Sequence, residues 1–106
     1  GKHVHKKIKE HKLEVIENLT GHGIGTSLHQ EPQHVFNYFD PWDNLILKDG
    51  MCLAVEPFVS TKAKTVGNSD RDEWELVAND GSYIAQYEHT IVVRENAEPL
   101  ILTKID

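Results

Sequence analysis

The sequence is poor in cysteine, in cationic side chains and in long apolar runs. Its single cysteine, Cys52, excludes an internal disulfide and is typical of a reducing compartment. Lys and Arg number 11 against 17 Asp and Glu, and the net charge of −6 argues against nucleic acid or an anionic membrane as a general partner. No apolar run approaches the length of a membrane span, and no signal peptide is visible. Together these absences predict a cytoplasmic protein.

What is present is the composition of an ordinary globular domain. Hydrophobic residues make up 39% and charged residues 26% of the 106 positions, which allows one domain with a modest core. The chain begins with Gly1, not with methionine, and runs straight into a helical pattern. We therefore expect a processed or excised piece of a longer protein.

The spacing of apolar residues predicts an α+β fold with a mostly antiparallel sheet. Helical periodicity covers residues 2–12, and strands are expected at 13–19, 51–59, 74–78, 82–95 and 99–103. Pro57 is expected to end the second of these strands. Asn79-Asp80-Gly81 predicts a hairpin turn between the third and the fourth. Glycine, proline and polar residues predict long loops at 20–44 and 60–72.

Two acidic residues lie in apolar surroundings. Glu56 occurs within "LAVEPFV" and Glu88 within "IAQYEHTIVV". An ionised carboxylate inside an apolar strand costs several kcal/mol unless it is neutralised or hydrogen-bonded. Either residue alone could be an ion-pair partner or could face solvent from an edge strand. Two of them indicate a shared positive charge, for which a divalent cation is the economical choice.

His22 lies between two glycines in "GHGIG", a context that leaves its imidazole uncrowded. Such a histidine can donate one ring nitrogen to a metal, although the glycines could instead serve a turn in which the histidine is incidental. Together with Glu56 and Glu88 it makes a nitrogen and oxygen ligand set suited to Co, Mn, Fe or Zn. The spacings are too long for any local metal signature.

Three motifs carry a family resemblance. "GHGIGTSLHQEPQHVFNY", "LKDGMCLAVEPFV" and "WELVANDGSYIAQYEHTIVV" resemble, in order and spacing, the C-terminal half of type I methionine aminopeptidases. The similarity covers essentially residues 1–106 and implies the C-terminal half of a pita-bread fold, with a curved, mostly antiparallel sheet and a flanking helix. The implied activity is removal of the N-terminal methionine from nascent polypeptides by a hydroxide activated by two divalent metal ions.

The resemblance also implies roles for individual residues. His22 and Glu56 look like ligands of one metal ion, and Glu88 like the carboxylate that bridges both ions. Glu56 can also pass on a proton. His29 looks like the histidine that hydrogen-bonds the scissile peptide and stabilises the developing oxyanion.

Leu28 and Trp74 fall where the family lines its pocket for the methionine side chain. Two departures stand beside them. Gln30 occupies a position that is usually acidic, and Leu28 one that is often aromatic. Neither belongs to the metal ligands, and the change at Leu28 predicts a looser preference for methionine.

The family takes two further aspartate ligands and a substrate-binding histidine from its N-terminal half, which these 106 residues do not contain. We therefore expect the isolated chain to bind one metal ion weakly and to lack appreciable peptidase activity. An exposed sheet edge and apolar face predict a partner, either the missing N-terminal half or a second copy of the chain.

Two other functions stay open from the sequence. An X-Pro peptidase of the same fold tends to have "EPG" after the first glutamate, whereas this chain has "EPF". A non-catalytic peptide-binding module would tend to lose the ligands, and His22, Glu56 and Glu88 are all present.

Overall fold

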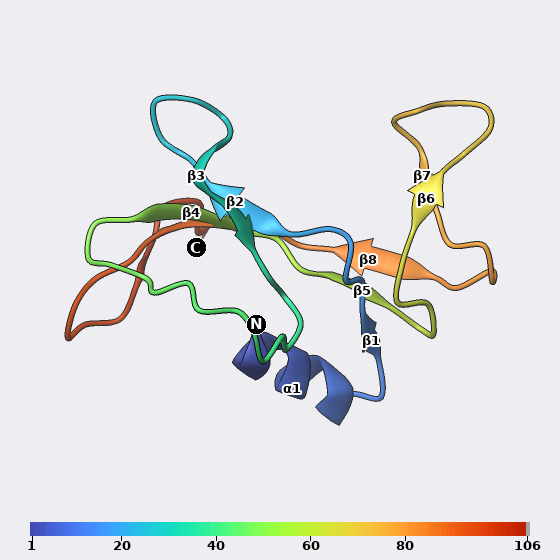
Figure 1. The fold of residues 1–106 in the computed structure, drawn as a ribbon, viewed down its shortest axis with the longest axis horizontal. Helices are drawn as coiled ribbons and strands as arrows, with labels where there is room; N and C mark the ends of the chain where they lie inside the picture. Colours follow the sequence, from blue (N-terminus) through green and yellow to red (C-terminus); the bar gives the residue numbers. More distant parts are fainter. Residues whose placement is uncertain (106) are drawn as a thin grey trace.

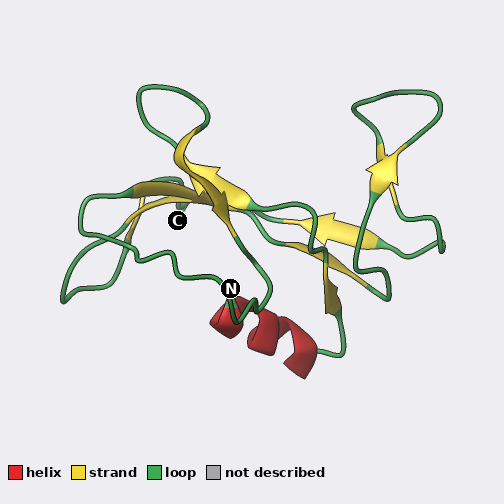
Figure 2. Cartoon of the chain, viewed as in Figure 1, coloured by secondary structure: helices red, strands yellow, loops and turns green. Residues whose placement is uncertain are grey.

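Strands dominate the computed structural model, which describes residues 1–105 (Figures 1 and 2). Its elements are α1 (Lys2–Glu10), β1 (Glu14–Val15), β2 (Gly21–Gly23), β3 (Gln30–Val35), β4 (Cys52–Val55), β5 (Phe58–Ser60), β6 (Gly67–Asn68), β7 (Leu76–Val77), β8 (Ile84–Gln86), β9 (His89–Val92) and β10 (Leu100–Ile101). Figure 1 shows α1 on one side of the sheet layer, whereas the β2–β3 and β6–β7 loops project on the other side.

The strands form antiparallel sheets with the orders β10–β9–β4–β2–β3, β1–β5–β8 and β6–β7. The two larger sheets share two chain segments, because β4 continues into β5 and β8 continues into β9. Val55 lies opposite His89 on one side of the junction, and Phe58 lies opposite Gln86 on the other. The register is therefore the same across the gap, and it sets Glu56 opposite Glu88.

The expected strand at 51–59 is wrong as a single element that ends at Pro57. Pro57 has no N–H to donate, so pairing stops at Glu56 and Pro57 but resumes in β5. The expected strand at 82–95 is likewise divided, at Tyr87 and Glu88. Both acidic residues thus lie in this gap and not inside a strand, and Glu88 is exposed.

The loop predicted at 20–44 is also wrong, since it contains β2 and β3. Glycine and proline made this segment look irregular, yet each has a place in the sheet. A Cβ on Gly21 would collide with the carbonyl oxygen of Ala54, so only glycine allows β2 and β4 to approach closely. Pro32 is tolerated because β3 is an edge strand.

The hairpin predicted around Asn79-Asp80-Gly81 does not form. Gly81 does have a positive φ of 78°, as a tight turn requires, but β7 pairs with β6 and β8 pairs with β5. The loop predicted at 60–72 accordingly contains β6. The helix and the last strand are confirmed, with the helix ending at Glu10.

The core is small. The buried hydrophobic residues among 1–105 are Val15, Ile16, Leu53, Ala54 and Ala63. Large apolar side chains remain exposed between β3 and β4, where Trp42 is 88% and Ile46 is 72% exposed, and α1 buries no residue. The expected sheet edges, β3 and β10, are therefore present, whereas these exposed apolar residues lie on the segment between two strands and not on a face of the sheet. No helix among the described residues is long and apolar enough to cross a membrane.

Candidate metal centre

His22 is the middle residue of β2 and lies opposite Ala54 of β4. Its side chain is one of the few buried polar groups, with a residue exposure of 8%. The glycines on both sides serve close approach of neighbouring strands, because a Cβ on Gly23 would collide with the carbonyl oxygen of Glu31 on β3. The "GHG" pattern therefore lets the strands on both sides of β2 pack close to the backbone beside His22.

The hydrogen bonds of His22 define which of its nitrogens is available. Nδ1 lies 2.8 Å from the carbonyl oxygen of Gly23, and because a carbonyl only accepts, Nδ1 is the donor. In the neutral ring Nε2 then carries the lone pair, and it lies 3.2 Å from Oε2 of Glu56. Two acceptors at this distance need a proton or a cation between them.

The electrostatics of Glu56 point the same way. Burial raises the pKa of its carboxyl, the negative charge of Glu88 raises it further, and His22 opposes both effects. Like charges directly opposite each other on neighbouring strands are destabilising unless a counter-charge is present. Glu56 and Glu88 are opposed in this way across the gap between the sheets. The cluster is therefore a place where added positive charge is favourable.

The donor chemistry fits a divalent ion, because one imidazole nitrogen and carboxylate oxygens are ligands of Mn, Fe, Co and Zn. As the side chains stand in residues 1–105, no group of three or more His, Cys, Asp or Glu is arranged so that it could hold a metal ion. The chain thus brings together a contacting His22–Glu56 pair and an opposing Glu88, which lie near one another without forming a complete metal-binding group.

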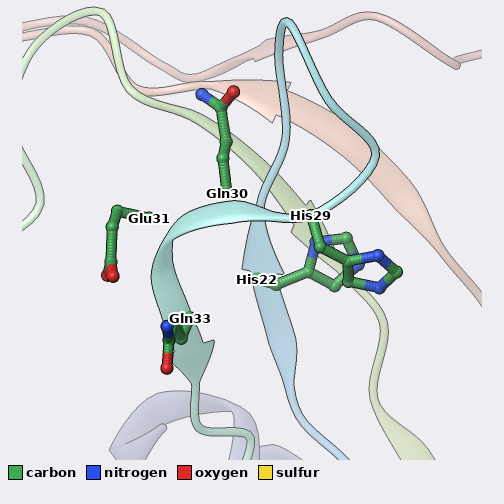
Figure 3. Close-up of a pocket in the computed structure, with 5 residues that line it drawn as sticks. All are labelled: His22, His29, Gln30, Glu31 and Gln33. Carbon is green, nitrogen blue, oxygen red and sulfur yellow. The ribbon is translucent and has the colours of Figure 1, made fainter.

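His29 lies just before β3 and packs against His22, with ring centroids 4.0 Å apart and ring planes inclined by 35°. The two rings line a pocket of about 360 Å³ together with Gln30, Glu31 and Gln33. Figure 3 shows the two imidazoles lying together, while the side chains of the other three residues point away from them. His29 is exposed, so its ring is open to a molecule in the pocket.

Leu28 and Trp74 lie on different loops. Leu28 precedes His29 in the β2–β3 loop and is 68% exposed, whereas Trp74 lies in the β6–β7 loop and is 85% exposed. Both loops project on the same side of the sheet in Figure 1. The structure thus brings His22, His29, Glu56 and Glu88 to one region and leaves Trp74 on a separate loop.

Sequence reasoning missed the contact of Gln86. Its Nε2 donates to Oε2 of Glu88 at 3.4 Å, which restrains the exposed carboxylate from the same strand segment. The spacing of two residues could have indicated this contact, because side chains at i and i+2 of an extended segment point to the same face.

Comparison with known proteins now defines the family. The model of metallopeptidase family M24 matches residues 1–95. The chain belongs to this family. Among relatives, the methionine aminopeptidase of Staphylococcus epidermidis is 52% identical over 106 residues, covering 100% of this chain and 41% of that protein. Methionine aminopeptidase 2 of Bacillus subtilis is 48% identical over 105 residues, covering 99% of this chain and 41% of that protein.

Solved structures of M24 relatives agree. The methionine aminopeptidase of Thermotoga maritima matches with a TM-score of 0.85 and 37% identity over 96% of this chain and 40% of that one. The methionine aminopeptidase of Rickettsia prowazekii matches with a TM-score of 0.83 and 34% identity, over 94% of this chain and 40% of that one. The predicted resemblance and the α+β pita-bread fold are confirmed. The chain spans about two fifths of the length of these relatives, 40% or 41% in each case.

Proposed function

We propose that this chain forms the C-terminal part of the active site of a methionine aminopeptidase, which removes the N-terminal methionine from nascent polypeptides in the cytoplasm. The observation that carries the proposal is the cluster of His22, Glu56 and Glu88. Its central contact is the 3.2 Å approach of His22 Nε2 to Glu56 Oε2. The names of the relatives support the substrate class.

In this proposal Nε2 of His22 and the carboxylates of Glu56 and Glu88 would hold the divalent metal ions. Bound divalent ions supply Lewis acidity and bring the pKa of water close to neutral. The hydrogen bond from Nδ1 to the carbonyl oxygen of Gly23 holds the His22 ring in the tautomer that a metal requires. Gln86 orients Glu88 through its amide.

Glu56 would transfer a proton, and His29 would stabilise the negative charge that develops on the substrate. Burial and the charge of Glu88 raise the pKa of Glu56, which suits a carboxylate that takes up and returns a proton during hydrolysis. His29 is exposed at the pocket and packed against His22, so it can donate a hydrogen bond to the scissile carbonyl oxygen. Leu28 and Trp74 would contact the methionine side chain.

The rest of the site would come from another segment. The family resemblance implies two aspartate ligands and a substrate-binding histidine from an N-terminal half. The small core and the exposed apolar residues between β3 and β4 support such a partner, with a second copy of the chain as the alternative. By itself the chain is expected to bind at most one metal ion weakly and not to cleave peptides.

A chimera tests the proposal. In it the matched 106 residues of the Staphylococcus epidermidis enzyme are replaced by this chain, so that the remainder of that protein supplies the missing segment. We expect the chimera to release methionine from a Met-Ala-Ser peptide and to lose this activity with a chelator. The isolated chain is the control. A folded chimera that binds metal but leaves the peptide intact would contradict the proposal.

A further inference from the structure

Within the β2–β3 loop, residues 24–29, His29 contacts the buried ring of His22, but the loop adds no side chain to the buried core. Residues 25–30 are all exposed, so the buried core does not hold them. At its start the loop is anchored by the N–H of Ile24, which donates to the carbonyl oxygen of Cys52 at 3.0 Å. At its end, Gly23 pairs with Gln30. Between these points the conformation depends on local polar contacts.

One side chain supplies the central contacts. The carbonyl oxygen Oε1 of Gln30 accepts from the backbone N–H of Thr26 at 3.1 Å and from the hydroxyl of Thr26 at 3.3 Å. Because a backbone N–H can only donate, these contacts also fix which end of the amide is the oxygen. We call this pair of hydrogen bonds the Gln30 clasp.

Gly25 makes room for the clasp. A Cβ built on Gly25 would lie 2.7 Å from Nε2 of Gln30, closer than real Cβ contacts, so the amide lies directly over this glycine. Two further hydrogen bonds stabilise the same loop. The N–H of Gly25 donates to the carbonyl oxygen of Ser27 at 3.1 Å, and the hydroxyl of Ser27 donates to the carbonyl oxygen of His29 at 3.0 Å.

We propose that Gln30 is a positioning residue that sets the side-chain preference of the peptidase by holding Leu28 and His29 through the clasp. The inference rests on the proposed function, in which both residues meet the substrate. Gln30 is held in the sheet by its pairing with Gly23, whereas Leu28 is 68% exposed on the loop. The clasp therefore restrains the loop conformation by attaching it to a residue of the sheet. Releasing the clasp gives Leu28 more conformations and weakens discrimination between substrate side chains.

The first test compares two substitutions in the chimera. Gln30→Met keeps the length of the side chain but removes the acceptor, whereas Gln30→Glu keeps an acceptor oxygen. We expect Gln30→Met to lower the ratio of kcat/KM for Met-Ala-Ser over Leu-Ala-Ser about three- to ten-fold, as the loss of one or two hydrogen bonds implies. Gln30→Glu should retain most of the ratio. An unchanged ratio in Gln30→Met would overturn the role in preference.

The second test measures the hydrogen bond to Thr26 directly and does not depend on catalytic activity. Hydrogen exchange of the Thr26 amide in the chimera should accelerate about three- to ten-fold in Gln30→Met and stay near the parent rate in Gln30→Glu. Gly25→Ala, which displaces the amide, should act like Gln30→Met, whereas Gly67→Ala is the matched control because nothing lies within 4 Å of a Cβ there. Unchanged exchange in Gln30→Met would overturn the clasp.

The outcomes separate the two proposals. A parent chimera that folds and binds metal but is inactive would overturn the proposed function and the preference role with it, while Thr26 exchange would still decide the clasp. If the parent chimera is active and the Gln30 variants have the same kcat/KM ratio as the parent, only the inference about Gln30 is overturned.

Discussion

The proposed metal ligands and the proposed substrate-contacting residues are held in place in different ways. His22, Glu56 and Glu88 belong to the sheet: His22 is a strand residue, and the two glutamates lie in a gap whose register is the same on both sides. Leu28 and Trp74 belong to loops and are 68% and 85% exposed. The first group is fixed by backbone pairing, whereas the second is held by local contacts.

The comparison teaches that the chemistry and the preference of this site can vary independently. A strand residue cannot shift without changing the face to which its neighbours point, so the distance between His22 and Glu56 is tied to the pairing of β2 with β4. A loop residue can shift without disturbing any pairing. We therefore expect substitutions of the three proposed metal ligands to abolish activity, and substitutions in the β2–β3 loop, or of Gln30 at its end, to alter substrate choice.

The largest effect is expected at the metal ligands. His22→Ala or Glu88→Gln in the chimera should lower kcat/KM for Met-Ala-Ser by at least about 100-fold. Even substitution of a residue that hydrogen-bonds to a metal ligand typically lowers metal affinity or activity 10- to 100-fold. Metal content after dialysis should fall with it. Retained activity and metal in either variant would remove that residue from the metal centre.

The next effect concerns the sheet itself. Gly23→Ala in the chimera places a Cβ against the carbonyl oxygen of Glu31, and strands β2 and β3 must separate to accept it. We expect a loss of about 1–3 kcal/mol in the free energy of unfolding, measured with denaturant. Gly67→Ala, where a Cβ meets nothing within 4 Å, should change stability little. Equal stability of both variants would show that close strand approach at His22 is unnecessary.

A smaller effect is expected at the loops. Leu28→Ala should leave the unfolding midpoint of the chimera unchanged, because the side chain is 68% exposed. It should nevertheless raise KM for Met-Ala-Ser about ten-fold through lost contact with the substrate side chain. Tyr83→Ala, at an 83% exposed residue just before β8, is the control that should leave KM unchanged. A drop in stability without a change in KM would place Leu28 in the fold and not in the site.

The smallest effect lies where α1 meets the sheet. The pKa of Glu14 is lowered, chiefly by its hydrogen bond from the ammonium group of Lys9. Since the folded pKa lies below the unfolded one, this contact stabilises the fold above the unfolded pKa, near 4.5, and the contribution disappears as pH falls through the folded pKa. Lys9 is half exposed and Glu14 is partly exposed, so solvent screens the pair, and Glu14→Gln should cost only a few tenths of a kcal/mol at pH 7 and less at pH 3, measured by denaturant unfolding. An equal cost at pH 7 and pH 3 would show that packing, not charge, accounts for the contact.

The sequence predicted the fold class and the family because three motifs were present in order. It also predicted the helix and the last strand from apolar spacing. Local patterns misled where tertiary context decides: Asn79-Asp80-Gly81 has the composition of a hairpin turn, yet the strands on either side pair elsewhere. Glycines around His22 resembled a loop because strand propensity ignores how closely another backbone approaches.

The candidate site was predictable in its residue types but not in its geometry. Two glutamates in apolar surroundings indicated a shared positive charge, and the structure sets them opposite each other. That opposition depends on the register between distant strands, which no local pattern contains. The clasp of Gln30 was also beyond sequence reasoning, since a polar residue next to a loop has many possible partners.

The gap at Glu56 and Pro57 has a consequence for insertions and deletions. Because the strands on both sides keep one register, a single added or deleted residue there would turn every following side chain of β5 to the opposite face. Length changes among relatives should therefore gather in the loops at 24–29 and 69–75 and be absent between Leu53 and Val59. In such a scaffold, new specificities arise by changing the length of a loop while the reaction centre keeps its spacing.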